Sequence, residues 1–243
     1  MNAIAFYLDE IVIYWSSIVM ALGIVAGTLL CYSLYTGQGG SPAVFILYTP
    51  IASAISIFLA RFIHWYCHAE QYSSLTAAMT DFSSGDFCMT GVLFGCIIAS
   101  LIIIVLRIAP DGKKFIDALG PGFLLTTAFI RFSALFNSTC RSKIPVNDES
   151  LHFLPLASPV VNSSGIVEWR FATFFAEGLV LLVMTLISLG FYAKRRKKKL
   201  KRKMRAPTAA MLSLLLFCAA ELLFDSTRYD ASFARSNGFV RLP

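Results

Sequence analysis

Residues 171–205 read FATFFAEGLVLLVMTLISLGFYAKRRKKKLKRKMR, and this stretch decides the fold class. Its first part, Phe171–Tyr192, is an apolar run in which Glu177 is the only charged residue, and its second part, Lys194–Arg205, holds ten basic residues in twelve positions. An apolar run of about 20 residues is long enough to cross the hydrocarbon core of a bilayer. A dense basic segment at the end of such a run is typical of a cytoplasmic loop. The stretch therefore predicts a membrane-spanning helix that ends on the cytoplasmic side.

The composition extends this prediction to the whole chain. Hydrophobic residues make up 57% and charged residues 14% of its 243 residues, whereas a soluble domain carries about 25% charged residues. The apolar runs that could span a membrane are Ile11–Tyr35, Val44–Tyr66, Met89–Ile108, Phe115–Phe136, Phe171–Tyr192 and Thr208–Phe224. We therefore expect an all-α polytopic membrane helix bundle with about six transmembrane helices, in a single integral membrane domain over residues 1–243.

Basic residues in the loops predict the orientation, because cytoplasmic loops are enriched in Lys and Arg. If the N-terminus lies outside, the cytoplasmic loops contain Arg107, Lys113, Lys114 and the basic loop at 193–207, and the outer loops contain far fewer basic residues. We therefore expect the N-terminus outside and outer loops at 67–88 and 137–170. The N-terminal segment lacks a basic region and a small-residue cleavage site, so we expect the first span to be retained. Residues 240–243, VRLP, resemble the beginning of a seventh span.

The net charge of +7 arises from the basic loop. Without Lys194–Arg205 the chain has 11 basic residues against 14 acidic ones. That segment has no interleaved aromatic residues and lies between two apolar runs, so we expect it to contact anionic inner-leaflet lipid at 194–205 and expect no nucleic-acid partner. The six cysteines lack metal-ligand spacing, so no metal site is expected. A disulfide among Cys67, Cys88 and Cys140, which flank the predicted outer ends, is an open alternative.

Charged residues at the outer ends of the predicted spans are the candidate functional groups, since charges are costly in lipid and usually face the bundle interior. Arg61, His64 and His68 form the first group, and their spacing places them on one helical face. Two readings are open for it. Arg61 is a functional group, or the three residues form a polar cap in which Arg61 extends toward the interface.

Arg131 belongs to the second group, with Asn137 and Arg141 after it. Its neighbours in the sequence are apolar, so its guanidinium needs an anionic partner. A lipid phosphate is one candidate, because arginine can bind phosphate with two hydrogen bonds. The other is an internal ion pair with a carboxylate such as Glu221 or Asp225.

Glu221, Asp225 and Arg228 form the third group, again on one helical face. Either Glu221 is functional, or a structural ion pair of Asp225 with Arg228 closes the end of the last span. Asp117 is expected in the first turn of its helix, where the helix dipole stabilises an acidic residue. Glu177 lies about two turns into an apolar run and is harder to explain by structure alone. The shared outer position of the three groups predicts one polar cavity that fits a phospholipid head group.

These features follow one another in an order that resembles the bacterial prolipoprotein diacylglyceryl transferases, along almost the whole chain. The family has an aromatic beginning to its first helix, a Gly-Arg-Leu step, a Gly-Gly…His-Gly-Gly stretch, an Arg-x-Gly-Asn-x-x-Asn signature, an acidic-Gly pair and an Arg-x-x-x-Glu-x-x-Arg motif. The matching residues here are, in the same order, Ile11–Trp15, Ala60-Arg61-Phe62, Gly85 with Thr90, Gly91 and Gly95, the segment from Phe115 through Arg131 to Asn137, Glu177-Gly178, and Glu221 through Arg228.

The resemblance implies a multi-pass enzyme of the bacterial cytoplasmic (inner) membrane that needs no cofactor. It takes the diacylglyceryl group from phosphatidylglycerol and joins it to the lipobox cysteine thiol of a prolipoprotein. Arg131 holds the phosphate, with Arg61 or Arg228 assisting. The implied catalytic residues are Arg131, Asn137, Thr90 and Glu221, and the implied phosphate- and lipid-binding residues are Arg61, Arg131, Arg228, Gly91 and Gly95.

This chain departs from the family pattern at four polar positions. Thr90 replaces a His, Ala134 replaces an Asn, Ser16 replaces a Tyr, and Glu221 replaces an arginine. The last change removes a phosphate ligand and repels an anionic lipid, unless Glu221 pairs with Arg131. The departures favour a second hypothesis, a non-catalytic membrane protein that binds lipid or lipoprotein as a subunit of a complex. A small transporter or channel subunit ranks third, because no clear repeat is found and the charges gather at one side.

Overall fold

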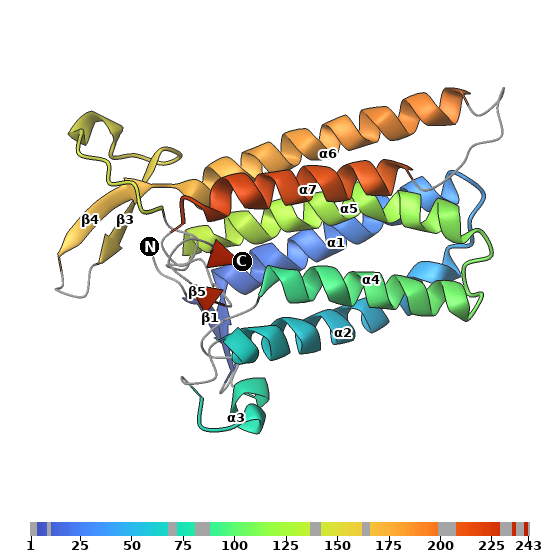
Figure 1. Ribbon diagram of the computed structural model, residues 1–243, viewed down its shortest axis with the longest axis horizontal. Coiled ribbons are helices and arrows are strands. Elements are labelled where there is room, and N and C mark those ends of the chain that lie inside the picture. The colour runs from blue at the N-terminus through green and yellow to red at the C-terminus, as the bar shows by residue number, and fades with distance from the viewer. Residues whose placement is uncertain are drawn as a thin grey trace. The chain divides into compact units, whose positions relative to one another are not determined.

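The computed structural model describes residues 4–8, 11–67, 72–80, 88–136, 142–161, 166–198, 208–228, 235–236 and 241–242. The chain divides into two compact units. The first unit comprises residues 1–34 and 116–231, and the second comprises residues 35–115 and 232–243. The elements are β1 (Ile4–Leu8), β2 (Ile11–Tyr14), α1 (Trp15–Thr36), α2 (Ala43–Cys67), α3 (Leu75–Thr80), α4 (Met89–Val105), α5 (Gly112–Ser133), a 3-10 turn (Ala134–Phe136), another (Glu149–Leu151), β3 (Ala157–Val161), β4 (Val167–Phe171), α6 (Thr173–Lys198), α7 (Thr208–Asp225), β5 (Arg235–Ser236) and β6 (Arg241–Leu242) (Figure 1).

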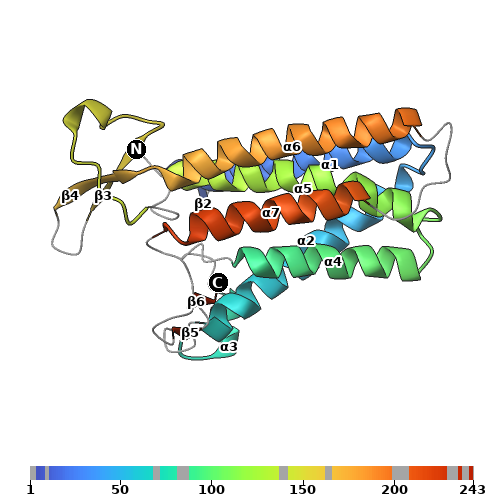
Figure 2. The same cartoon turned by 45° about the horizontal axis from the view of Figure 1, so that its top comes forward.

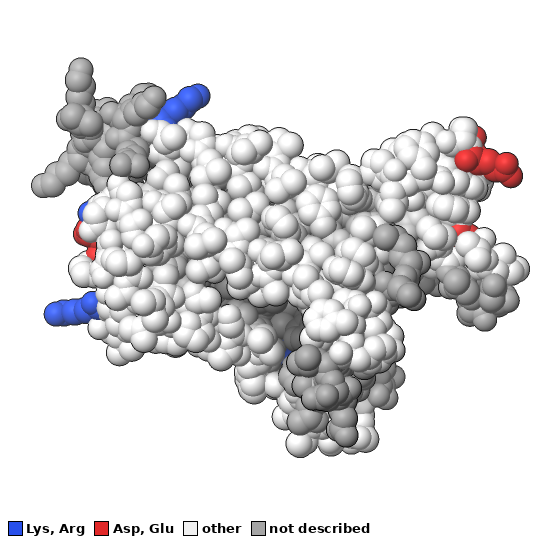
Figure 3. Space-filling model, turned by 180° about the vertical axis from the view of Figure 1, so that it is seen from behind, with Lys and Arg blue, Asp and Glu red and all other residues white. Residues whose placement is uncertain are grey.

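The helices confirm a polytopic membrane helix bundle. Within the described residues, four helices are long and apolar enough to cross a membrane, namely α1, α2, α5 with its 3-10 extension, and α6. Two shorter apolar helices, α4 and α7, correspond to the remaining predicted spans. On the face drawn in Figure 3, few described Lys, Arg, Asp or Glu side chains are visible away from the margins of the view. Large hydrophobic side chains of the helices, among them Leu22, Phe58, Leu101 and Leu186, are exposed, which is typical of a lipid-facing wall.

Two predicted spans begin too early. Ile11 does not start a helix, because residues Ile11–Tyr14 form β2 and pair antiparallel with β1, and α1 begins at Trp15. These residues are β-branched or aromatic, and such side chains favour a strand wherever a partner strand is present. Phe171 likewise belongs to β4, and α6 begins at Thr173.

Two helices end at positions that differ from the predicted ones. The helix α4 ends at Val105, before the predicted Ile108, and Arg107 has a left-handed backbone with φ of 55°. A residue in that conformation cannot continue a right-handed helix. The helix α6 continues past Tyr192 to Lys198 and so includes the beginning of the basic segment.

Small residues bring α1 and α5 together in the first unit. A Cβ on Gly23 would lie 2.4 Å from Phe129 Cβ, and one on Gly27 would lie 1.9 Å from Thr126 Oγ1. Thr126 Oγ1 also donates a hydrogen bond to the Gly23 carbonyl at 3.2 Å. Close approach at small residues and hydrogen bonds between helices are the usual means of packing membrane helices. Figure 2 shows α1, α5, α6 and α7 running side by side.

Asp117 joins the N-terminal ends of α5 and α7. The structure corrects the expectation that Asp117 lies in the first turn of its own helix, because α5 begins at Gly112. Asp117 Oδ1 instead accepts hydrogen bonds from the backbone N–H of Ala209 at 2.9 Å and of Ala210 at 3.3 Å. These are amides of the first turn of α7, which have no acceptor in their own helix. Asp117 therefore caps α7 from a neighbouring helix.

Asp117→Ala is expected to lower the free energy of unfolding by about 1 kcal/mol, which is the typical loss for a removed helix cap. Asp117→Asn keeps an acceptor oxygen and should lose less. Thermal unfolding in detergent measures both variants. Glu149→Ala is the control, because Glu149 is an exposed carboxylate. Equal stability of Asp117→Ala and Glu149→Ala would contradict the capping role.

Gly91 and Gly95 lie where α2 and α4 pack in the second unit. A Cβ on Gly91 would lie 2.4 Å from Ala60 Cα, and one on Gly95 would lie 2.4 Å from Ser56 Cα. Ser56 Oγ also donates to the Val92 carbonyl at 3.2 Å. Both glycines therefore have a packing role in the second unit, and their predicted lipid contact stays a prediction.

The predicted outer loop 137–170 contains a small sheet. Strands β3 and β4 pair antiparallel, and the second edge of β4 is bridged by Pro145 opposite Arg170. The Lys143 N–H donates to the Thr227 carbonyl at 2.8 Å, which ties this region to the end of α7. In Figure 1 the hairpin projects from the end of the helices where α6 begins.

Candidate functional site

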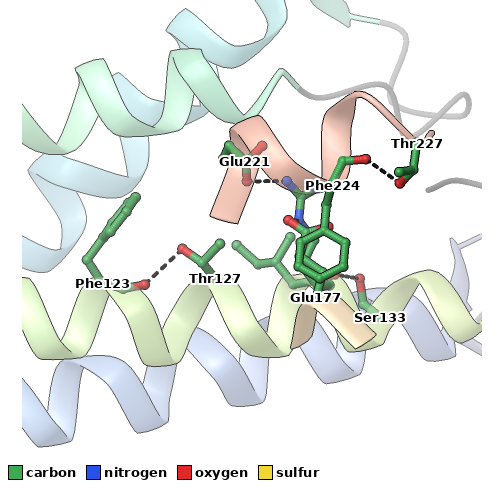
Figure 4. Close-up of polar contacts among 9 residues, drawn as sticks. Phe123, Thr127, Ser133, Glu177, Glu221, Phe224 and Thr227 are labelled. Carbon is green, nitrogen blue, oxygen red and sulfur yellow. Dashed lines mark hydrogen bonds and ion pairs between the residues drawn. The ribbon is translucent and has the colours of Figure 1, made fainter. Parts of the chain in front are cut away.

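Three helices of the first unit bring charged side chains together. Arg131 lies near the end of α5, Glu177 lies in the second turn of α6, and Glu221 lies near the end of α7. Arg131 Nε donates to Glu177 Oε1 at 2.6 Å, and Arg131 Nη2 donates to Glu221 Oε1. Figure 4 labels Glu177 and Glu221 and marks with a dashed line the hydrogen bond that Glu221 accepts. We call Arg131, Glu177 and Glu221 the Arg131 cluster.

Burial distinguishes the members of the Arg131 cluster. The Arg131 side chain is 3% exposed and that of Glu177 is 0% exposed, whereas that of Glu221 is 19% exposed. Charges in a low-dielectric interior are stable only when they are paired and hydrogen-bonded. Each ion of the cluster meets this condition through its partners. Glu221 is the member that lies toward the accessible side.

A second arginine, Arg228, belongs to the same compact unit as the Arg131 cluster. One guanidinium between two ionised carboxylates has a net charge of −1. Arg228, which is half-buried just after α7, adds a coulombic attraction to Glu177. The backbone around Arg228 is held by its bridge to Ser142, so the outer sheet region also supports this position. With all four side chains ionised, their formal charges sum to zero.

Nearby hydroxyl groups are satisfied within their own helices. Thr127, one turn before Arg131 on α5, donates to the Phe123 carbonyl at 2.8 Å, and Ser133 donates to the Ile130 carbonyl at 2.7 Å (Figure 4). Such bonds to the preceding turn are the usual way for Ser and Thr to sit inside a helix. By contrast, Oε2 of Glu177 is buried and has no hydrogen-bond partner among the described residues. Glu177 therefore keeps an acceptor atom beyond its ion pair.

The structure contains one of the two partners expected for Arg131. The internal ion pair with Glu221 is present, and the contact with a lipid phosphate stays a prediction. The more buried partner of Arg131, Glu177, is not identified by the sequence argument. A signal was available, because Glu177 is the only charge in its apolar run and a lone acid in a membrane helix needs a basic partner.

Other predicted site residues lie in the second unit. Arg61 is buried in α2, with 2% of its surface exposed, so it does not extend to the protein surface. His64 is half-buried with its ring 6.1 Å from that of Tyr72. Thr90 is exposed at the start of α4. These residues and the Arg131 cluster belong to different units, so their predicted convergence on one cavity stays a prediction.

Several predicted residues lie outside the part of the chain that the structure describes. They are His68, Gly85, Asn137, Cys140, Arg141 and the side chain of Asp225. The ion pair of Asp225 with Arg228 therefore stays a prediction. Among the described residues, no group of three or more His, Cys, Asp or Glu side chains could hold a metal ion.

Comparison with known proteins gives one family. A family model described as prolipoprotein diacylglyceryl transferase matches residues 3–239. No curated protein matches the chain. The matched range covers most of both compact units and includes every member of the Arg131 cluster.

Proposed function

Because the chain belongs to the prolipoprotein diacylglyceryl transferase family, we propose that it transfers a diacylglyceryl group from phosphatidylglycerol to the lipobox cysteine thiol of a prolipoprotein. The bond from the diacylglyceryl carbon to the phosphate oxygen breaks, and a thioether bond forms between that carbon and the cysteine sulfur. Glycerol phosphate leaves with the electron pair of the broken bond, and the thiol proton passes to the surrounding water. The observation that supports this proposal most is the buried Arg131 cluster within the matched range.

Arg131 is proposed to stabilise the leaving phosphate. A guanidinium held inside a helix bundle is preorganised, and it acts at low dielectric where charge stabilisation is strong. Its planar donors match the oxygens of a phosphate. Arg228 lies near enough to attract Glu177 and is proposed to assist, as is Arg61 of the second unit. Asn137 stays a candidate for orienting the head group, and Thr90 or Glu221 stays a candidate for the position nearest the missing catalytic base.

The proposed location is the cytoplasmic membrane of a bacterium. There the basic loop at 193–207 lies against the inner leaflet, where anionic lipid attracts Lys and Arg. The ends of α5 and α7 that carry Arg131 and Glu221 then lie at the outer leaflet. A secreted prolipoprotein and a phospholipid can both reach that depth.

A transfer assay in liposomes tests the proposal. It uses phosphatidylglycerol labelled in its acyl chains and a lipobox peptide, with a peptide that has Ser in place of the cysteine as the control. We expect label on the cysteine peptide alone, and about 100-fold slower transfer by Arg131→Lys, because lysine keeps the charge but loses the planar donors. Equal transfer by the native chain and Arg131→Lys would contradict the role of Arg131.

One observation favours a second candidate function. Two donors of Arg131, Nε and Nη2, are already bound by the protein's own carboxylates. A non-catalytic protein that binds lipid or lipoprotein would not need an arginine with donors available to bind a lipid phosphate. Absence of transfer by a folded chain that still retains phosphatidylglycerol would favour this second candidate.

A further inference from the structure

The two carboxylates of the Arg131 cluster have different surroundings. Glu177 is fully buried, and the adjacent Gly178 lies so close to Phe132 of α5 that a Cβ there would be 2.6 Å from the ring. The position of Glu177 is thus fixed by the packing of α6 on α5. Glu221 is partly exposed, and the next residues on α7, Leu222 and Leu223, are 77% and 62% exposed. Glu221 therefore lies at the margin of the bundle.

We propose that Glu221 is an internal competitor of the lipid phosphate, whereas Glu177 holds Arg131 in place throughout. In the resting protein the Glu221 carboxylate occupies Arg131 Nη2, and the phosphate of the lipid donor takes this position when it binds. This inference rests on the proposed function, in which Arg131 holds the phosphate. It adds a regulatory contact to that site.

Guanidinium geometry supports this division of roles. The Nε and Nη2 hydrogens lie on one edge, and an anion that binds with two hydrogen bonds uses such an edge. In this chain the edge is divided, with Nε bound by Glu177 and Nη2 bound by Glu221. Glu177 is sealed inside the bundle, so the Nη2 donor is the one at which an arriving phosphate can replace a carboxylate. Carboxylate and phosphate compete there for the same hydrogen bond.

The contact of Glu221 with Arg131 also has a structural role. While no lipid is bound, Glu221 supplies a second negative partner to an arginine that would otherwise have an unfilled donor in the interior, which is costly. When phosphate binds, it supplies that negative charge instead. The exchange leaves Arg131 paired in both states.

The comparison of Glu221→Gln with Glu177→Gln distinguishes competition for Arg131 from an effect of net charge on lipid binding. Glutamine keeps the shape and an acceptor oxygen but binds the guanidinium more weakly, so affinity for phosphatidylglycerol should rise about tenfold, the value of one charged hydrogen bond. Glu177→Gln removes the same charge but weakens the fixed partner of Arg131, so it should not increase the affinity. A purely electrostatic effect would instead tighten binding in both variants.

The experiment measures equilibrium binding of fluorescent phosphatidylglycerol to the native chain, Glu221→Gln and Glu177→Gln in detergent. Diacylglycerol with the same acyl chains, which lacks the phosphate, is the control ligand. Tighter binding of phosphatidylglycerol alone, by Glu221→Gln alone, is the expected result, with a matching fall in KM where transfer occurs. Unchanged affinity in folded Glu221→Gln, or equal tightening in both variants, would overturn the proposal.

This test is separate from that of the proposed function, and a replacement variant is at hand if Glu221→Gln does not fold. Binding is measured without turnover, so a chain that transfers nothing still reports on competition by Glu221. If Glu221→Gln fails to fold, Glu221→Asp takes its place, because its shorter side chain draws the carboxylate away from Arg131. It should shift the affinity in the same direction, and unchanged affinity would again contradict the proposal.

Discussion

Arg131→Met should lower the free energy of unfolding by about 3–5 kcal/mol, the cost of leaving buried charge without its partner. Methionine fills a similar volume, so the loss comes from Glu177 and Glu221, which then face each other without a cation between them. Thermal unfolding of the purified protein in detergent measures the change. A loss no larger than that of Asp117→Ala would show that Arg131 contributes little to the packing of α5, α6 and α7.

Neutralising the whole cluster is the control for this prediction. In the triple variant Arg131→Met, Glu177→Gln, Glu221→Gln, no member of the Arg131 cluster keeps a charge, and the half-buried Arg228 keeps its own charge. Replacing a buried ion cluster by neutral side chains is often close to neutral for stability. We therefore expect the triple variant to recover most of the stability that Arg131→Met loses. Failure to recover it would mean that side-chain shape, rather than charge, determines how much the cluster contributes to stability.

Gly91→Val should be the most disruptive substitution in the second unit. A Cβ at residue 91 would lie within 2.4–2.6 Å of Ala60 Cα, Ala60 N and Leu59 C, all of them backbone atoms that cannot move aside. Overpacking of a tight interface costs about 1–3 kcal/mol, and more where backbone must shift. A lower unfolding temperature, measured in detergent, is the expected result.

Gly190→Ala is the matched control for Gly91→Val. Gly190 lies inside α6, and nothing lies within 4 Å of a Cβ placed there. Alanine in an open helix position stabilises the helix by about 1 kcal/mol relative to glycine. The two substitutions should therefore shift the unfolding temperature in opposite directions. A stable Gly91→Val protein with weakened lipid binding would instead support the lipid-binding role predicted for Gly91.

The helices could be predicted from the sequence because lipid imposes a simple requirement. An apolar run must satisfy its backbone internally and must be long enough to span the membrane. All the predicted spans contain a helix in the structure. The errors fall at boundaries such as Ile11–Tyr14, where the same apolar residues form a hairpin with Ile4–Leu8. Hydrophobicity alone does not distinguish a buried strand from the first turn of a span.

The site could be predicted only in part. Arg131 stood out because a charge within an apolar run is costly, and this argument identifies residues one at a time. Which carboxylate meets it depends on how α6 and α7 rotate against α5, and no pattern within a single helix contains that information. Asp117 shows the same limit, since the backbone amides that it caps lie on α7, far away in the sequence.

Transfer by the folded triple variant Arg131→Met, Glu177→Gln, Glu221→Gln tests the central claim most directly, because this protein keeps its packing and lacks the guanidinium. The measurement compares its transfer of labelled diacylglyceryl from phosphatidylglycerol to the lipobox peptide with that of the native chain. Our account predicts a stable protein with transfer reduced at least about 100-fold, the size of effect expected when a charge-stabilising group is removed. Transfer at the native rate would contradict it and would show that the Arg131 cluster only holds the helices together.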